Sequence, residues 1–544
     1  MMGGAGPRVL ASRVALVGAL GGALFALAHC GSSADAGGAL PFGGGGLSSD
    51  AAASGGSGAY AAGGAGGSAL PPEKELEGSY RAPVTTGKYV WSANPDSGRV
   101  ALIDATNLQV HTVEAGFGPT YLAAIPGQNG ATANTAIVLN VLGHDATLLR
   151  VQADESIATK TLPTHESANA WTIGPAGHWA IAWSDARKVK NPDPTQGFQD
   201  VTVIRLDSGK EASTELSVGY RPTSVRFDAS GTRAYAVTDP GISVISLDGA
   251  APQVTDLVQV TDNPADNPAS RDVTITPDGK LALVRRDGSP DVGVVTLSTG
   301  QRTTLTLSGN VTDLDLSQDG TRAVAVVRSA SEVDVLPIPD IVTSSFYPSV
   351  KIDGEEFGSV SLSPDGNVAL LYENAVDNDH VTILSLDSQS YLDHRTVALK
   401  APVQAVFVTP DGENALALQS TPAGSTKAGA FSVIPTTVVR APRIEGTDAP
   451  PTAVAVAPPP SSRALVTVRD DQTKQFGVYV VRMPSLQVDY LPLASPPIAT
   501  GMVPAAGKGY VAQLNPDGRI TFIDLTDGSA RTLTGFELAA KVVN

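Results

Sequence analysis

The chain contains little cysteine, few aromatic residues and few charged residues for its length. Cys30 is the only thiol, which excludes an internal disulfide and any zinc or iron–sulfur site built on several thiolates. Aromatic residues make up 5% and charged residues 17% of the 544 positions, both below the usual composition of soluble domains. Because 42% of the residues are hydrophobic, the chain can still form a core, and wholesale disorder is excluded.

Basic residues and long apolar runs are also scarce. Lys and Arg number 37 against 54 Asp and Glu, giving a formal net charge of −17. No basic stretch is long enough to follow a phosphate backbone, so we expect no nucleic acid partner. The apolar run at 14–28 is shorter than the ~20 residues of a membrane-spanning helix, and no run of spanning length follows it.

Residues 1–30 resemble a signal peptide of the bacterial lipoprotein type. Two arginines precede the apolar run, and Leu27-Ala28-His29-Cys30 follows it. This tetrapeptide is similar to the lipobox, in which the cysteine is acylated and becomes the new N-terminus, although a small residue is usual where His29 stands. The alternative is cleavage by ordinary signal peptidase after the A-x-A sequence at 26–28.

The segment after Cys30 is expected to be a tether. Gly, Ser and Ala fill 32 of the 40 positions in 31–70, a composition typical of flexible linkers, and we assign 31–75 to this tether. With a lipidated Cys30, the protein would be held at a membrane in the bacterial cell envelope, most simply as an outer-membrane lipoprotein. The A-x-A alternative would give a periplasmic or secreted protein.

Residues 79–544 repeat one phrase, in which two alternating apolar strands flank a Pro-Asp-Gly turn. Alternation with a period of two indicates half-buried strands. In the turn, proline presets φ, aspartate accepts a backbone N–H, and glycine supplies positive φ. The clearest copies are 272–284, 313–327, 359–372 and 405–418.

Two further strands follow each phrase, so the repeating unit has four antiparallel strands. Innermost strands are predicted to begin near Pro119, Asn169, Pro222, Arg271, Val311, Gly358, Pro402, Pro451 and Pro497. Their spacing of 40 to 53 residues is the signature of an all-β fold, the β-propeller. We count about ten blades, with seven to ten compatible with the weaker repeats. Residues 87–114 lack an innermost strand, so the C-terminal strand at 535–543 is expected to supply it and close the ring.

The stretch at 89–125 resembles the YVTN-type β-propeller repeat. The matching positions are Tyr89-Val90, Ser97-Gly98, Val100, Ile103-Asp104, Gly116 and Pro119, while the Thr-Asn pair of the repeat is displaced because Trp91-Ser92-Ala93 precede Asn94. The resemblance implies a propeller fold over 79–544. It does not imply one function, because the repeat serves binding proteins, lactonases and electron-transfer enzymes.

Motifs for metal or cofactor chemistry are not evident. No two histidines have ligand spacing such as H-x-H, and a haem attachment sequence is absent. The oxygen-rich segments 377–379 and 262–272 do not follow the calcium-loop pattern, so we expect solvated loops. The sequence therefore predicts no metal and no cofactor.

The loops differ between the two faces of the predicted ring. The turns joining the first to the second strand and the third to the fourth are short, whereas the connections from the second to the third are long and polar, as at 184–199, 373–380 and 419–429. Since loops on a rigid scaffold commonly bind ligands, the long-loop face is the predicted recognition surface. The candidate contacts are Lys188, Lys190, Arg285, Arg286, Asp470 and Asp471.

Two functions agree with these features. The first is a lipid-anchored propeller that binds or scaffolds an envelope protein, an extracellular protein or a glycan. The alternative is a propeller hydrolase of the lactonase kind, in which carboxylates and a divalent metal would converge in the channel. We expect the first, because the sequence shows no converging ligand set.

Overall fold

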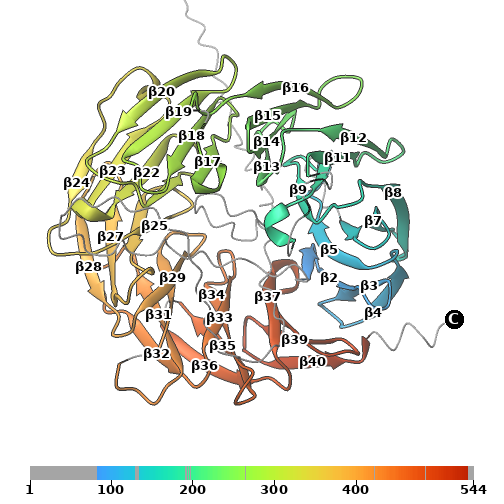
Figure 1. The fold of residues 1–544 in the computed structure, drawn as a ribbon. Coiled ribbons are helices and arrows are strands. Elements are labelled where there is room, and N and C mark those ends of the chain that lie inside the picture. Colours follow the sequence, from blue (N-terminus) through green and yellow to red (C-terminus); the bar gives the residue numbers. More distant parts are fainter. Residues whose placement is uncertain are drawn as a thin grey trace, which may run out of the picture.

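The computed structural model describes residues 83–128, 134–189, 193, 195, 198–263, 265–421, 423–483 and 485–536. These residues form ten four-stranded antiparallel sheets in which strands consecutive in the chain are neighbours. The sheets follow one another around a ring as the blades of a β-propeller (Figure 1). We call the strands of each blade a to d, from the innermost to the outermost.

The first five blades contain the following strands. Blade 1 comprises β1 (Val84–Thr86), β2 (Tyr89–Asn94), β3 (Arg99–Asp104) and β4 (Val110–Glu114). Blade 2 comprises β5 (Pro119–Ala124), β6 (Thr135–Asn140), β7 (Asp145–Val151) and β8 (Ile157–Pro163). Blade 3 comprises β9 (Ala170–Ile173), β10 (Trp179–Trp183), β11 (Asp200–Arg205) and β12 (Ala212–Ser217). Blade 4 comprises β13 (Ser224–Phe227), β14 (Arg233–Thr238), β15 (Gly241–Ser246) and β16 (Gln253–Val258). Blade 5 comprises β17 (Arg271–Ile275), β18 (Leu281–Arg286), β19 (Asp291–Thr296) and β20 (Gln301–Thr306).

The last five blades repeat this arrangement. Blade 6 comprises β21 (Asp313–Leu316), β22 (Arg322–Val327), β23 (Glu332–Pro337) and β24 (Ser349–Lys351). Blade 7 comprises β25 (Ser359–Leu362), β26 (Val368–Tyr372), β27 (His380–Ser385) and β28 (His394–Ala398). Blade 8 comprises β29 (Val403–Val408), β30 (Asn414–Gln419), β31 (Gly429–Pro435) and β32 (Arg443–Thr447). Blade 9 comprises β33 (Pro451–Val456), β34 (Arg463–Asp470), β35 (Gln475–Arg482) and β36 (Gln487–Pro492). Blade 10 comprises β37 (Pro497–Val503), β38 (Lys508–Gln513), β39 (Arg519–Asp524) and β40 (Ala530–Thr534).

Short 3₁₀ helices lie in the connections between strands. They are η2 (Ala186–Lys188), η3 (Pro268–Ser270), η4 (Arg328–Ala330), η5 (Asp340–Val342) and η6 (Pro504–Ala506). The nine innermost strands predicted from the repeat all begin within two residues of their expected positions. The predicted all-β propeller and its count of about ten blades are therefore confirmed.

The Pro-Asp-Gly turns have the expected geometry. In blade 5, Gly279 has a φ of +66° and its amide donates to the carbonyl of Thr276 at 2.8 Å. The carboxylate of Asp278 accepts the amide of Lys280 at 3.1 Å, which closes the turn. A Cβ on Gly279 would lie 2.4 Å from the hydroxyl of Tyr235 in blade 4, so glycine is needed here for space as well as for conformation.

Aliphatic side chains fill the interfaces between successive blades. Val, Leu, Ile and Ala from the b and c strands of one blade pack against the a to c strands of the next, as in the cluster of Leu283, Val294 and Leu314 between blades 5 and 6. Two tryptophans, Trp91 and Trp183, are fully buried and pack between neighbouring blades in the same way. Face-to-face packing of this kind buries both sides of every sheet and explains the near-continuous apolar b and c strands.

Blade 10 closes the ring by packing directly against blade 1. Tyr510 and Phe522 share a core cluster with Val90 and Ile103, and the Tyr510 hydroxyl donates to the carbonyl of Pro83 at 2.8 Å. Figure 1 shows β37 to β40, in red, beside β2 to β4, in blue.

The prediction that the C-terminal strand supplies the innermost strand of blade 1 is wrong. That strand is β1, which pairs with β2 from Val84↔Trp91 to Thr86↔Tyr89. It has only three residues, too few to show an alternating pattern in the sequence. Most of the predicted 535–543 strand lies outside the described residues.

Candidate binding face

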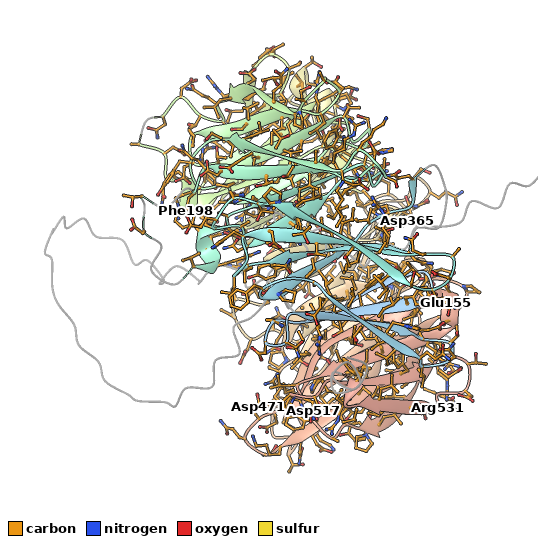
Figure 2. The ribbon with its side chains drawn as sticks, turned by 90° about the vertical axis from the view of Figure 1, so that its right-hand side faces the viewer. Glu155, Phe198, Asp365, Asp471, Asp517 and Arg531 are labelled. Atoms are coloured by element: carbon orange, nitrogen blue, oxygen red, sulfur yellow. The ribbon has the colours of Figure 1, made fainter. Side chains whose placement is uncertain are left out.

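The two faces of the ring carry different connections. The b–c loops and the d–a crossovers lie on one side, at Phe198, Asp471 and Asp517 in Figure 2, and we call this side the b–c face. The a–b and c–d turns lie on the other side, at Asp365 and Glu155, and we call it the a–b face. The prediction that all c–d turns are short is wrong, because the c–d connections at 338–348 and 386–393 are also long. Long loops therefore lie on both faces.

A buried carboxylate holds the longest b–c loop, at 184–199. Asp185, whose side chain is 1% exposed, caps η2 by accepting the Arg187 amide at 3.0 Å. It also accepts Nε and Nη2 of the same arginine at 3.0 and 2.9 Å. Arg187 Nη2 donates in turn to the carbonyl of Thr223 in blade 4 at 2.7 Å. The loop is thus fastened both to its own blade and to the next one.

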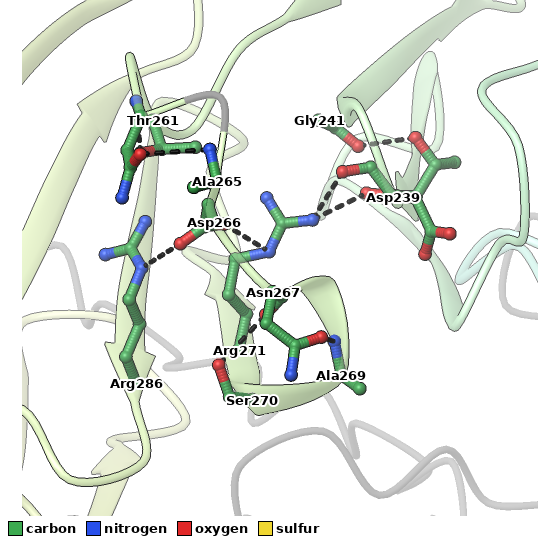
Figure 3. A network of polar contacts seen from close by, with 12 residues as sticks. Asp239, Gly241, Thr261, Ala265, Asp266, Asn267, Ala269, Ser270, Arg271 and Arg286 are labelled. Atoms are coloured by element: carbon green, nitrogen blue, oxygen red, sulfur yellow. Dashed lines mark hydrogen bonds and ion pairs between the residues drawn. The ribbon is translucent and has the colours of Figure 1, made fainter. Parts of the chain in front are cut away.

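A second carboxylate, largely buried, holds the long d–a crossover between blades 4 and 5. The side chain of Asp266 is 9% exposed and lies between two guanidinium groups, with Arg271 Nε at 3.2 Å and Arg286 Nε at 2.8 Å (Figure 3). Arg271 extends the network by donating to the backbone carbonyl of Asp239 in blade 4. Burial lowers the pKa of Arg271, and the charge of Asp266 offsets part of this effect.

A third buried carboxylate holds the b–c loop of blade 7. Glu373 is fully buried, with Arg328 of blade 6 at 2.7 Å from Nε and 3.1 Å from Nη2. The same carboxylate accepts the amide of Ala375 at 2.7 Å, which orders the start of the loop. As with Asp185 and Asp266, one acid therefore binds both its own loop and an arginine, and here the arginine belongs to the neighbouring blade.

Arginine and carboxylate groups continue this arrangement at the junction of blades 5 and 6. Arg285 lies 3.8 Å from Asp272 and 3.0 Å from Asp287, and it donates to the carbonyl of Val311 at 3.5 Å. Asp313, on the neighbouring innermost strand, accepts the amide of Val360 in blade 7 at 2.8 Å. Burial raises the pKa of Asp313 above its usual range.

The structure places the five described residues among the six predicted contacts on three separate blades. Lys188 belongs to blade 3, Arg285 and Arg286 to blade 5, and Asp470 and Asp471 to blade 9. Lys190 lies outside the described residues.

Most of these side chains support loops through their own local contacts. Lys188 Nζ lies 3.9 Å from Asp185 and 5.7 Å from the centre of the Trp183 ring. Asp470 accepts the amides of Gln472 and Thr473 at 2.8 and 3.1 Å, and the Thr473 side chain together with these amides lowers its pKa. Asp471 pairs with Arg469 at 2.8 Å. Their role in binding stays a prediction.

Sequence reasoning missed the three buried acids that anchor the loops. A signal was present for two of them, because Asp185 and Glu373 follow alternating apolar strands almost directly, where a charged side chain stands at the rim of a buried sheet. Asp266 does not follow a strand in this way, and the sequence marks it only as part of the oxygen-rich segment 262–272.

The segment at 377–379 behaves as a structural loop. Asn378 donates to the carbonyl of Glu356 at 3.0 Å and accepts the amide of His380 at 2.8 Å. Across the described ranges, no group of three or more His, Cys, Asp or Glu side chains is placed to hold a metal ion. In the same ranges, no helix has the length and apolar character needed to cross a membrane.

Comparison with known proteins gives similarity only at the level of solved structures. No protein-family model and no curated protein matches the chain. Hydrazine synthase of Kuenenia stuttgartiensis aligns at 15% identity and a TM-score of 0.33, over 68% of this chain and 95% of that one. The dihydro-heme d1 dehydrogenase NirN aligns at 12% and 0.42, over 78% and 76%. A eukaryotic initiation factor aligns at 14% and 0.47, over 72% and 94%. At these values the matches carry no argument about the activity of this chain, and its assignment as a propeller comes from its own sheet topology.

Proposed function

We propose that this protein is an envelope-anchored binding module that recognises a charged protein partner through its b–c face. In this proposal Cys30 carries the lipid, residues 31–75 form the tether, and the ten-bladed ring presents the recognition surface. The observation that carries the proposal is the set of buried acids Asp185, Asp266 and Glu373, each of which fixes a connection on the same face.

Stability alone is a poor reason for these ion pairs. Removing two charges from water costs several kcal/mol per ion, and a buried pair is often no more stabilising than apolar side chains of similar volume. What such pairs supply is a defined conformation for the groups that they join. A loop that is already ordered loses less conformational entropy when a partner binds, so pre-ordered loops favour tight and selective recognition.

The exposed charges of the b–c face favour a partner of complementary charge. Three acids project from different connections, and about half or more of each side chain is exposed, although each has an arginine neighbour. They are Asp262, Asp287 and Asp471. Mixed charges at the rim of an interface steer association and make it sensitive to salt. We therefore expect binding to weaken as ionic strength rises.

The proposal is tested by crosslinking the full-length chain in its native envelope and identifying the captured proteins. The variant Asp262→Asn/Asp287→Asn/Asp471→Asn removes three charges from the b–c face. A matched control, Glu155→Gln/Asp248→Asn/Asp527→Asn, removes three from c–d turns on the a–b face. The proposal expects one partner to be lost in the first variant and retained in the second, and equal capture by both variants would refute it.

A further inference from the structure

A cavity of about 990 Å³ opens on the a–b face between blades 6 and 7. It lies on the side of the ring opposite to the surface discussed above, and its walls are the two long c–d connections at 338–348 and 386–393. Its volume is at the upper end of the range usual for small-ligand sites, about 300–1,000 Å³. The side chains that matter for its chemistry are Arg322, Asp340, Phe346, Asn367, Asp387 and Tyr391.

The walls of this cavity are well-defined structure. In the blade 6 connection, Ile341 is 1% exposed and inserts into the core between blades 5 and 6. The Asp340 carbonyl accepts the amides of Thr343 and Ser344 at 3.0 and 2.9 Å. Arg322 forms a bridge to the opposite wall, donating from Nη1 to the carbonyl of Leu386 at 2.9 Å. This hydrogen bond ties the blade 7 connection to strand β22 of blade 6.

Two aromatic rings remain exposed within this ordered setting. Phe346 is 77% exposed and Tyr391 is 41% exposed, and both line the cavity. The amide of Phe346 donates to the Ser344 hydroxyl at 3.2 Å, so the backbone that carries the ring is ordered. Because the same connection buries Ile341, the exposure of Phe346 is not a consequence of a loosely packed loop. Exposed aromatic faces at the wall of a cavity favour contact with an apolar face of a ligand.

The polar groups of the cavity select the chemistry of that ligand. The carboxylates of Asp340 and Asp387 can only accept hydrogen bonds when ionised, whereas the Arg322 guanidinium can only donate, and the Asn367 amide does both. Hydroxyl groups satisfy both kinds of wall, because each hydroxyl donates one hydrogen bond and accepts others. A ligand with a strong net charge of either sign would meet a like charge among Arg322, Asp340 and Asp387.

We propose that the cavity between blades 6 and 7 binds a neutral oligosaccharide, with the C–H faces of its sugar rings on Phe346 and Tyr391 and its hydroxyls on Asp340, Asp387 and Arg322. A pyranose ring combines an apolar face with a rim of hydroxyls, which matches the two kinds of wall. The site is separate from the b–c face, so this inference and the proposed partner binding succeed or fail independently.

The experiment is calorimetric titration of the purified full-length chain with short neutral oligomers of glucose, mannose, galactose and N-acetylglucosamine. Saturable binding of at least one series is expected. Phe346→Ala and Asp387→Asn should each weaken it by roughly tenfold, which corresponds to about 1.4 kcal/mol. Val439→Ala is the matched control, because Val439 is an exposed apolar side chain on the c–d connection of blade 8, outside the cavity. It should leave the affinity unchanged.

Several outcomes would overturn the inference. They are the absence of saturable binding to every neutral series, equal affinity in Phe346→Ala and Val439→Ala, and selective binding of charged oligosaccharides or proline-rich peptides when these are titrated in parallel. Phe346 is exposed, so its replacement should not change the thermal unfolding midpoint, and that midpoint distinguishes a lost site from a lost fold.

Discussion

Asp334 should destabilise the folded ring at neutral pH, and its replacement by threonine should remove this effect. The residue lies in β23, where it is 0% exposed, and neither carboxylate oxygen has a hydrogen-bond partner among the described residues. Strand registers place serine or threonine at the corresponding c-strand position of six other blades. These are Thr147, Thr202, Ser243, Thr382, Ser432 and Thr521. All six hydroxyls are buried and hydrogen-bonded, so a threonine fits this position in the repeat.

The size of the effect follows from the pKa of Asp334. Burial raises this pKa from 3.8 to about 7, with a contribution from the nearby Glu332 and against the lowering effect of the Ser349 hydroxyl. Below pH ~4 the carboxyl is protonated in both the folded and the unfolded chain, so it costs nothing. Between pH ~4 and ~7 only the unfolded chain releases the proton, and stability falls with rising pH by up to about 1.4 kcal/mol per unit. Above pH ~7 the full cost applies, at most roughly 4 kcal/mol.

Urea unfolding of the wild-type chain and of Asp334→Thr at pH 4, 6 and 8 measures this difference. We expect the variant to gain about 2–4 kcal/mol at pH 8 and little at pH 4. Asp334→Asn tests the charge without the change of shape, and it should show the same dependence on pH. The reverse substitution Ser243→Asp should introduce a similar loss in blade 4. A gain that is equal at all three pH values, or no gain at pH 8, would refute the reasoning.

Three further predictions concern a turn, an ion pair and the anchor. Gly279→Ala should lower the free energy of unfolding by about 1–3 kcal/mol, because the residue has positive φ and its Cβ would meet Tyr235. Gly288→Ala should cost less, because Gly288 also has positive φ (+71°) but nothing lies within 4 Å of its Cβ. Urea unfolding midpoints compare the two variants. Arg328→Met should cost about 3–5 kcal/mol by leaving Glu373 buried without its cation, and Arg328→Met/Glu373→Leu should recover most of the loss in the same assay. Cys30→Ala should abolish incorporation of a fatty-acid probe, and a labelled Cys30→Ala chain would contradict the lipoprotein assignment.

The repeat was predictable from sequence because its information is local. Alternation, turn residues and spacing lie within each unit, so the positions of nine innermost strands and the geometry of turns such as that at Gly279 could be derived without tertiary contacts. Closure of the ring could not, since it depends on contacts between residues such as Pro83 and Tyr510 at opposite ends of the chain. The three-residue β1 has no pattern of its own and forms because blade 10 and β2 provide a place for it.

The candidate surfaces were less predictable for a related reason. The sequence shows that Arg286 and Asp266 are charged, but only the fold places them 2.8 Å apart, and this pairing turns a candidate contact into a support for a loop. Loop length was also a partial guide. It identified 184–199 and 373–380 on the b–c face, yet the cavity with Phe346 and Tyr391 depends on two c–d connections from neighbouring blades that meet only in the folded ring.

Aliphatic side chains and buried acids have different roles in this ring. Aliphatic side chains between blades account for the cohesion of the ring, and each blade could in principle be held by them alone. Asp185 and Glu373 instead lie where a sheet gives way to a connection, and Asp266 lies within a connection. Each accepts hydrogen bonds from a guanidinium group. Asp334, which lies within a blade interface and has no such partner, shows the cost of a carboxylate in the core. Each of these three acids at the rim of a blade therefore has a cation beside it, and the geometry of the b–c face connections is what these paired charges maintain.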